Sequence, residues 1–312
     1  MAKKRSRSSN LGCVIIALTI IIIALIVTII IITNPQKFKK NNSSSNTEIK
    51  SVEKSGGNDS QVSSGAGIDE QVLWETSDGV KVVAKGLTYN SNGELSEINV
   101  YAENNSSKNV GIGTDVIIIN DYMITDLTSI KVNAGGKTND KIRISGTALR
   151  EAGIDNVGKI EMYLHTFDPD SYHTLESSEC ITIKTTDYDK MDTETTISGT
   201  PIIDENGIRV YAQYVDENSF WGAGLVIYIE NNTDYIIHAY ADDTAVNGFT
   251  IKGVFAAEVY PHKKDISSLT FLSTNLEENG ITDIRNIDLS LRVMDDDRNE
   301  IANSGTMQIT AK

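Results

Sequence analysis

Histidine and aspartate side chains gather in one short stretch, where His165, Asp168, Asp170 and His173 lie within nine residues. Imidazole and carboxylate groups are suitable ligands for zinc or manganese. The same stretch also fits a turn between two strands, because an aspartate side chain bonds readily to nearby backbone. The spacing leaves both interpretations open, a metal site at the tip of a hairpin and a turn, and the turn is favoured.

A second acidic stretch begins like a calcium-binding loop, with Asp295, Asp297 and Asn299 at alternate positions. Calcium loops place glycine at the sixth position, for a sharp turn, and a bidentate glutamate at the twelfth. Here Glu300 occupies the sixth position and Thr306 the twelfth. We therefore expect no cofactor at this stretch, except weak calcium binding at millimolar concentration.

Two other features resemble reactive groups less closely. The run 134–138 ends like a phosphate loop, but Lys131 stands where such a loop needs glycine, so we predict a turn between strands. Cys180 lacks a marked base and an oxyanion hole, which a cysteine nucleophile needs, and we predict an inert cysteine in a strand. No catalytic residue is predicted, and we expect the protein not to be an enzyme.

The second half of the chain repeats the first half at an offset of 127 residues. The matching segments are 101–105 with 228–232, 120–124 with 247–251, and 147–154 with 274–281. A repeat of this length is a whole domain and not a short solenoid unit. Features present in both copies can therefore be separated from features present in one.

The candidate metal ligands fall mostly in the part that differs. Arg292 and Glu300 replace His165 and His173, and only the two aspartates recur, as Asp295 and Asp297. A duplicated active site should appear twice, so the shared part is interpreted as scaffold. A specific site would then belong to one copy or to the junction between them.

Each copy shows the two-residue hydrophobic period of β-strands. The segments 80–84 and 208–212 match each other, as do 160–164 and 287–291. Asp78-Gly79, Asn206-Gly207 and Asn247-Gly248 are dipeptides typical of type I′ hairpin turns. The only helical signal is 147–153, matched by 274–280, with a threonine N-cap and a C-terminal glycine.

Short strands with frequent turns predict an all-β fold made of two tandem Ig-like antiparallel β-sandwiches. The quoted turn and core motifs, Tyr-x-Glu-Asn-Asn, Asn-Gly-Phe and Gly-Ile-x-x-Ile-x-x-Ile-x-Leu, resemble a domain found in uncharacterised membrane-anchored surface proteins of Firmicutes. Those domains are similar to the Ig-like sandwiches grouped with secreted immunogenic proteins of mycobacteria. The resemblance implies an Ig-like fold at the bacterial surface and carries no catalytic residues.

A run of 22 uncharged residues near the N-terminus, 11–32, is long enough to cross a membrane as one helix. We expect an uncleaved anchor, because no small-residue cleavage pattern follows the run. Four positive charges precede the run and three follow it, a slight bias toward a cytoplasmic N-terminus. The predicted order is a cytoplasmic tail 1–10, a transmembrane helix 11–32, a flexible stalk 33–69, a sandwich 70–186, a linker 187–198 and a sandwich 199–312.

Charge narrows the class of partner. The first 40 residues hold seven basic and no acidic side chains, which leaves 21 basic against 43 acidic from residue 41 onward. A surface this acidic excludes nucleic-acid binding. We expect a single-pass protein of the cell membrane with extracellular domains that bind an envelope, protein or glycan partner in adhesion or envelope interaction. The alternative is a sensor that binds a solute or calcium at the interdomain cleft.

Overall fold

The computed structural model describes residues 65–311, apart from 125, 127, 192–197 and 220. The chain divides into two compact units, Met1–Gln61 and Val62–Lys312, and every described residue belongs to the second unit. The expected tail 1–10, transmembrane helix 11–32 and stalk up to residue 64 lie outside the described residues. Within the described part, no helix combines the length and apolar character needed to cross a membrane.

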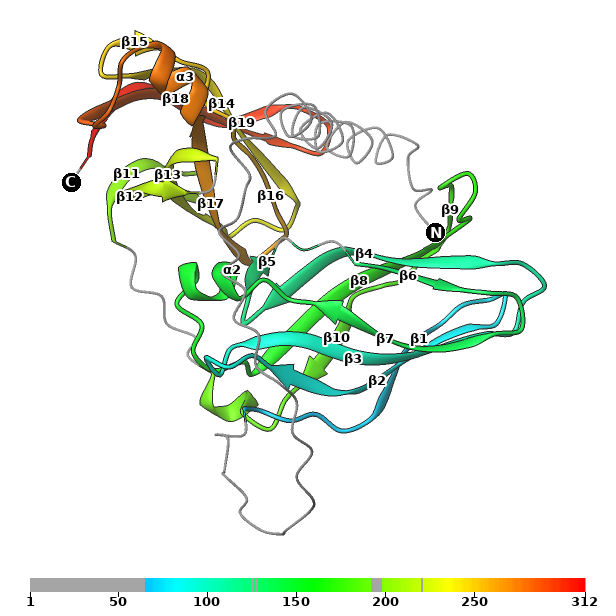
Figure 1. The fold of residues 1–312 in the computed structure, drawn as a ribbon. Coiled ribbons are helices and arrows are strands. Elements are labelled where there is room, and N and C mark those ends of the chain that lie inside the picture. Colours follow the sequence, from blue (N-terminus) through cyan, green and yellow to red (C-terminus); the bar gives the residue numbers. More distant parts are fainter. Residues whose placement is uncertain (1–64, 125, 127, 192–197, 220, 312) are drawn as a thin grey trace, which may run out of the picture. The chain divides into compact units, whose positions relative to one another are not determined.

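The described residues contain nineteen strands and very little helix, which confirms the all-β prediction (Figure 1). The first copy contains β1 (Gln71–Glu75), β2 (Val80–Tyr89), β3 (Leu95–Asn104), β4 (Val110–Ile119), β5 (Tyr122–Ile124), β6 (Ser129–Val132), β7 (Lys137–Arg143), α2 (Gly146–Glu151), β8 (Lys159–Phe167), β9 (Thr174–Ser177) and β10 (Ile181–Lys184). A 3₁₀ turn, η1 (Tyr188–Lys190), follows at the start of the expected linker.

The second copy repeats this order. It contains β11 (Thr200–Glu205), β12 (Ile208–Ser219), β13 (Gly222–Asn231), β14 (Ile237–Val246), β15 (Phe249–Thr250), β16 (Ala256–Val259), β17 (Lys263–Leu272), α3 (Ser273–Glu278), β18 (Asn286–Asp295) and β19 (Glu300–Thr310). The repeat in the sequence is therefore a repeat of the fold, in which the single strand β19 takes the places of both β9 and β10.

Strand order within the sheets is the same in both copies. The first copy pairs β1-β2-β3-β7 in one sheet and β10-β8-β4-β5 in the other, and the second pairs β11-β12-β13-β17 and β19-β18-β14-β15. The short strands β6 and β16 pair with β4 and β14. The architecture of each copy is β-sandwich-like, with buried side chains between two antiparallel sheets.

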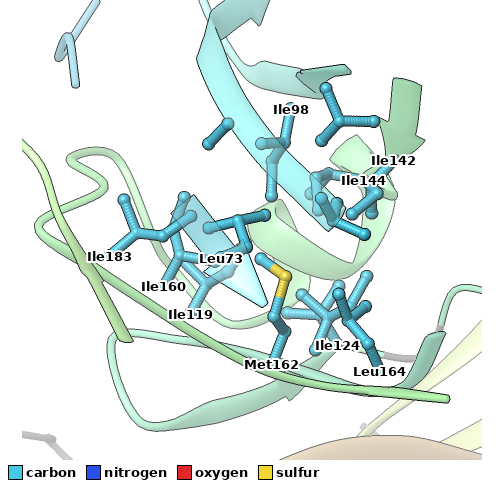
Figure 2. Packing of buried hydrophobic residues seen from close by; sticks show 14 of the residues in the cluster. Leu73, Ile98, Ile119, Ile124, Ile142, Ile144, Ile160, Met162, Leu164 and Ile183 are labelled. Carbon is cyan, nitrogen blue, oxygen red and sulfur yellow. The ribbon is translucent and has the colours of Figure 1, made fainter. Parts of the chain in front are cut away.

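The period-two pattern places alternate side chains in these cores. Along β8 and β18 every second residue is buried, beginning with Ile160 and Ile287. Figure 2 shows the first core, where Leu73, Ile98 and Ile142 of one sheet lie close to Ile119, Ile160 and Met162 of the other. Complete burial of one such side chain contributes about 2 kcal/mol.

The backbone conformation of the turns confirms two of the three predicted type I′ dipeptides. Asn206-Gly207 and Asn247-Gly248 have positive φ at both residues, but in Asp78-Gly79 only Gly79 does. The Asp78-Gly79 prediction was wrong because type I′ needs both residues in the left-handed region. Asn120 and Asp121, at φ 49° and 69°, form an equivalent turn that the sequence analysis did not single out.

The predicted helical turns are present, with different N-caps. In α2 the cap is Ser145, whose hydroxyl accepts from the amide of Ala148, and not Thr147. In α3 the N-cap position is Leu272, which makes no side-chain cap. The C-terminal prediction is confirmed, since Gly153 and Gly280 have φ 67° and 65°.

The last described residues of the expected stalk contact the first copy. Ala66 is 6% exposed, and its carbonyl accepts a hydrogen bond of 2.7 Å from the hydroxyl of Tyr89. Gly67 exchanges two hydrogen bonds with Thr186, one to the side chain and one from the backbone amide. Residues packed on the first copy thus include some before residue 70, the boundary expected from composition.

Candidate functional site

A buried asparagine organises the same corner of each copy. Asn104 donates from Nδ2 to the carbonyls of Lys108, Val132 and Asn133, at 2.7, 3.2 and 3.2 Å. Its Oδ1 accepts from the amide and hydroxyl of Ser106. Both Asn104 and its counterpart Asn231 are fully buried, at 0% exposure.

Asn231 makes the matching five bonds, to the carbonyls of Tyr235, Val259 and Tyr260 and from the amide and hydroxyl of Thr233. A buried side-chain amide with its donors and acceptor satisfied fixes one backbone arrangement. The Tyr-x-Glu-Asn-Asn motif is therefore a framework motif and not a binding motif.

A second asparagine closes the hairpin after β4 and after β14. Asn120 Oδ1 accepts from the amides of Gly158 and Lys159, and its Nδ2 donates to the carbonyl of Asn156 at 2.6 Å. Asn247 does the same with the amides of Arg285 and Asn286 and the carbonyl of Asp283. Asparagine suits this place because it tolerates positive φ while its side chain bonds to backbone.

The stretch from His165 to His173 forms a hairpin turn between β8 and β9. Asp168 Oδ1 accepts from the amides of Asp170 and Ser171, at 2.9 and 3.0 Å. The amide of Asp168 donates to the carbonyl of His173 at 2.9 Å. These backbone bonds, first that of Ser171, lower the pKa of the Asp168 carboxyl. These hydrogen bonds are those of a turn between two strands, the interpretation favoured from the sequence.

The stretch from Asp295 to Asn299 is the equivalent turn between β18 and β19. Asp295 Oδ1 accepts from the amide of Asn299 at 2.8 Å, and its Oδ2 accepts from the Asn299 side chain at 2.9 Å. The Asn299 side-chain bond is the largest cause that lowers the pKa of Asp295. Asp297 contributes a backbone bond to the same carboxylate.

His165 lies away from the turn and faces β4. Its Nδ1 is 2.7 Å from Oδ1 of Asp115, an ion-pair contact without the alignment of a hydrogen bond. At the equivalent place in the second copy, Arg292 Nη2 lies 2.9 Å from Asp242. Both copies thus place a nitrogen-bearing side chain opposite an aspartate at this position, and arginine, unlike histidine, is not a metal ligand.

A further histidine, His238 of β14, lies among acidic side chains and was not predicted as a site residue from the sequence. Its ring lies between two carboxylates, with Nδ1 3.5 Å from Glu258 and Nε2 2.9 Å from Asp296. Burial raises the pKa of Glu258, and the neighbouring His238 partly opposes this rise. Among the residues that the structure describes, no group of three histidine, cysteine or acidic side chains is arranged to hold a metal ion. Metal binding at the named candidates stays a prediction.

The two copies meet edge to edge between β5 and β17. Tyr122 and Lys264 are partners in parallel register, which joins the sheets of both copies into one ten-stranded sheet. The amide of Lys264 donates to the carbonyl of Asp121 at 2.8 Å, and its ammonium lies 5.3 Å from the Tyr122 ring centre. Tyr228 of β13 is 1% exposed and belongs to the same buried cluster as the first core.

Four charged side chains close this joint. Lys263 Nζ lies 2.6 Å from both Asp121 Oδ1 and Glu161 Oε2, and Lys159 Nζ lies 2.7 and 3.2 Å from the same two carboxylates. Their side chains are between 13% and 29% exposed. Burial favours a higher pKa for Asp121, but the bonds from Lys159 and Lys263 outweigh it and lower that pKa.

Beyond these charges the joint continues along β8. The rings of Tyr163 and Tyr260 are 5.1 Å apart at their centres. Burial, and then the neighbouring thiol of Cys180, raise the pKa of Tyr163 to about 12. Cys180 itself is exposed and lies just before β10, so the prediction that it belongs to a strand was wrong by one residue. The turn predicted at 134–138 is present between β6 and β7 at residues 134–136, and residues 137–138 already belong to β7.

Large apolar side chains lie exposed near the β12–β13 hairpin of the second copy. Trp221 is 45% exposed, Tyr214 48%, Val254 43% and Leu272 36%. Trp221 directly precedes β13, and its carbonyl accepts a bond of 3.0 Å from the amide of Ser273, the residue after Leu272. The first copy has Glu94 and Ser145 at the positions of Trp221 and Leu272. This exposed group therefore belongs to one copy.

In comparisons with known proteins, no family model matches the chain, and no curated protein matches it. Among solved structures, the chain is similar to the YadV chaperone, with 12% identity, coverage of 74% of this chain and 99% of that chain, and a TM-score of 0.23. The SafB chaperone of Salmonella enterica, in complex with the SafA pilin, gives 13% identity, 76% and 98% coverage and a TM-score of 0.21.

An exo-chitosanase of Amycolatopsis orientalis is also similar, with 10% identity over 72% of this chain and 26% of that chain, at a TM-score of 0.22. At TM-scores this low, none of these likenesses carries an argument about function. The class that the fold defines is an all-β, β-sandwich-like protein built from a duplicated unit.

Proposed function

We propose that this chain is a non-enzymatic surface protein, anchored in the membrane by residues 11–32, that presents two Ig-like β-sandwiches outside the cell. Its role is adhesion or envelope interaction with a protein or glycan partner. The resemblance to membrane-anchored surface proteins of Firmicutes belongs to this proposal, as do the single-pass topology and the extracellular location.

One observation carries the proposal: the two copies share their buried framework and differ on their surfaces. Asn104 and Asn231 make five matching hydrogen bonds each, and Asn120 and Asn247 close matching turns. Side chains on the outer faces are not matched between the copies, since Trp221 of the second copy stands at the position of Glu94 in the first. A conserved frame with variable surfaces is the arrangement of a scaffold that presents binding surfaces.

The joint supports presentation of these surfaces in a fixed register. The ionic contacts of Lys263 and the parallel pair at Tyr122 tie the copies together at several points. A binding protein gains affinity when its surfaces are held in place before the partner arrives. The alternative of a solute or calcium sensor has less support, because the charged groups of the joint are already satisfied by one another.

The exposed apolar group around Trp221 is the surface on which we place partner binding. Tryptophan and tyrosine supply much of the binding energy in protein interfaces, and exposed apolar groups of this kind mark interaction sites. The backbones of Trp221 and Leu272 lie close together at the ends of β13 and β17, since the residue after Trp221 pairs with Leu272, and Val254 pairs with Thr270, two residues before Leu272.

The test is crosslinking on intact cells with the full-length chain, followed by identification of the captured partner. A Trp221→Ala variant should lose most of the capture, while Tyr235→Ala, which truncates an aromatic side chain that is 41% exposed at another turn, should retain it. Equal capture by both variants would remove Trp221 from the site. Failure of the wild-type chain to capture any protein or glycan would contradict the binding function itself.

A further inference from the structure

The joint between the two copies is asymmetric, because each copy contributes a different edge. The first copy uses β5 and the second uses β17. A contact of this heterologous kind leaves one unused partner surface on each copy. Among the residues that the structure describes, these surfaces are β7, the counterpart of β17, which ends its sheet in the first copy, and β15, the counterpart of β5, which ends its sheet in the second.

The residues at the centre of the joint keep their chemistry on these unused edges. Phe249 stands at the position of Tyr122, and Lys137 stands at the position of Lys264. Phe249 is 48% exposed, and the Lys137 side chain is 60% exposed. An ammonium over an aromatic ring, as in Lys264 over Tyr122, forms equally with phenylalanine.

The backbone is prepared for the same contact. The internal joint uses the carbonyl of Asp121, presented by a left-handed residue with φ 69°, and Gly248 has the same conformation with φ 84°. The turn before β17, closed by a bond from Lys263 to Tyr260, recurs before β7 as a bond from Gly136 to Asn133. Both edges therefore hold the main-chain groups of the joint in place.

We propose that the Phe249 edge of one molecule docks on the Lys137 edge of a second copy of this chain, in the parallel register seen inside the chain. An open hollow of about 250 Å³, lined by Asn247, Ile281, Asp283 and Arg285, adjoins Phe249 on this surface. Because the two edges differ, each molecule can contact one neighbour through each edge, so that such contacts extend into a row, or into a ring where the rotation between molecules closes. The inference goes beyond partner binding, since it concerns association of the chain with itself.

The contact between molecules is weaker than the internal joint. The positions of its four charged residues are taken by Gly136, Gly248, Asn286 and Asp288, so the ionic contacts of Lys263 are lost. The acidic surface adds repulsion, which salt screens. Molecules confined to one membrane meet at a high effective concentration, where a weak contact of this kind is populated.

The test uses the full-length chain in membranes, with Cys13 and Cys180 replaced by serine. Lys137→Cys and Phe249→Cys are introduced on separate chains and also together on one chain, and the membranes are then oxidised with copper phenanthroline. Neighbouring strand partners lie within the Cα separation that a disulfide needs, about 4.4–6.8 Å. A Tyr122→Cys, Lys264→Cys chain serves as the internal reference, because its disulfide reports the register of the joint itself.

We expect dimers from mixed single variants, a ladder of higher species from the double variant, and little product from either single variant alone. Val72→Cys replaces Lys137→Cys in the control, since Val72 is 52% exposed on β1, the opposite edge of the same sheet. The proposal is overturned if the internal reference closes while the mixture gives no dimer. An equal amount of dimer from the Val72 control, or from one single variant alone, would also overturn it. If the internal reference forms no disulfide, the joint between the copies is absent in the membrane, and the proposal is overturned with it.

Discussion

Replacing Asp265 with asparagine should stabilise the protein at neutral pH. Asp265 is 4% exposed, and its Oδ2 accepts a bond of 2.5 Å from the hydroxyl of Ser267. Burial raises the pKa of its carboxyl to about 6, against the partial opposition of Ser267 and the amide of Ile266. The first copy has Thr138, a neutral residue, at this position. The second copy thus carries a buried carboxylate that the fold does not require.

The size of the effect follows from the difference in pKa. The unfolded chain releases this proton near 3.8 and the folded chain near 6, so the folded state binds more protons between these values. The contribution of this group is fully present below pH 3.8 and declines as the pH rises to about 6. At about 1.4 kcal/mol for each pH unit, the loss at neutral pH is about 3 kcal/mol.

The assay is urea unfolding of the wild type and Asp265→Asn between pH 4 and pH 8, followed by circular dichroism. Other carboxylates titrate equally in both proteins, so the difference between their free energies of unfolding isolates Asp265. We expect that difference to grow by about 2 kcal/mol in favour of the variant between pH 4 and pH 7, because part of the loss has already occurred at pH 4. A difference that is constant with pH would refute the reasoning, because it would mean that the carboxyl titrates alike in both states.

Three further predictions address the framework, the joint and the helix ends. Asn231→Ala and Asn104→Ala should each lower the free energy of unfolding by about 3 kcal/mol, because one buried and two partly buried carbonyls lose their donor. Equilibrium unfolding measures this, and a loss below about 1 kcal/mol would contradict the framework role. Lys263→Met should lower the free energy of unfolding by about 2 kcal/mol, since it leaves two partly buried carboxylates with one lysine. Equilibrium unfolding at low and high salt measures this, and an unchanged stability at low salt would argue against the joint. Gly153→Ala and Gly280→Ala should each lower the free energy of unfolding by about 1 kcal/mol, because a Cβ there meets nothing within 4 Å and only the positive φ opposes it. Melting temperatures of the two variants measure this, and a large difference between them would show that the two helix ends are not equivalent.

Much of the fold could be predicted from periodicity and turn chemistry. Alternation in 160–164 and 287–291 placed the central strands β8 and β18, because one face of each strand is buried and the other is not. Asn206-Gly207 marked its hairpin for a conformational reason, since both residues adopt positive φ. The N-caps were harder to place, because Ser145 and Thr147 both fit the cap composition and only the geometry separates them.

The joint could not be predicted from motifs, because its residues look like ordinary surface charges. Lys263, Asp121 and Glu161 are far apart in the sequence and belong to different copies. Lys263 and Asp121 are charged where the other copy has Gly136 and Gly248, whereas Glu161 aligns with another acidic residue, Asp288. The signal was thus present in the differences between the copies, at positions next to the matched edges.

The same comparison between copies bears on how His165 should be interpreted. His165 with Asp115 and Arg292 with Asp242 occupy one place in the fold, and each sets a nitrogen-bearing side chain against a carboxylate across two strands. A metal site would constrain that position to ligands, whereas a cross-strand polar contact accepts either side chain. The duplicated fold therefore favours the cross-strand contact, and metal binding at His165 stays a prediction. It leaves the exposed group around Trp221 and the edge at Phe249 as the surfaces whose chemistry the framework does not explain.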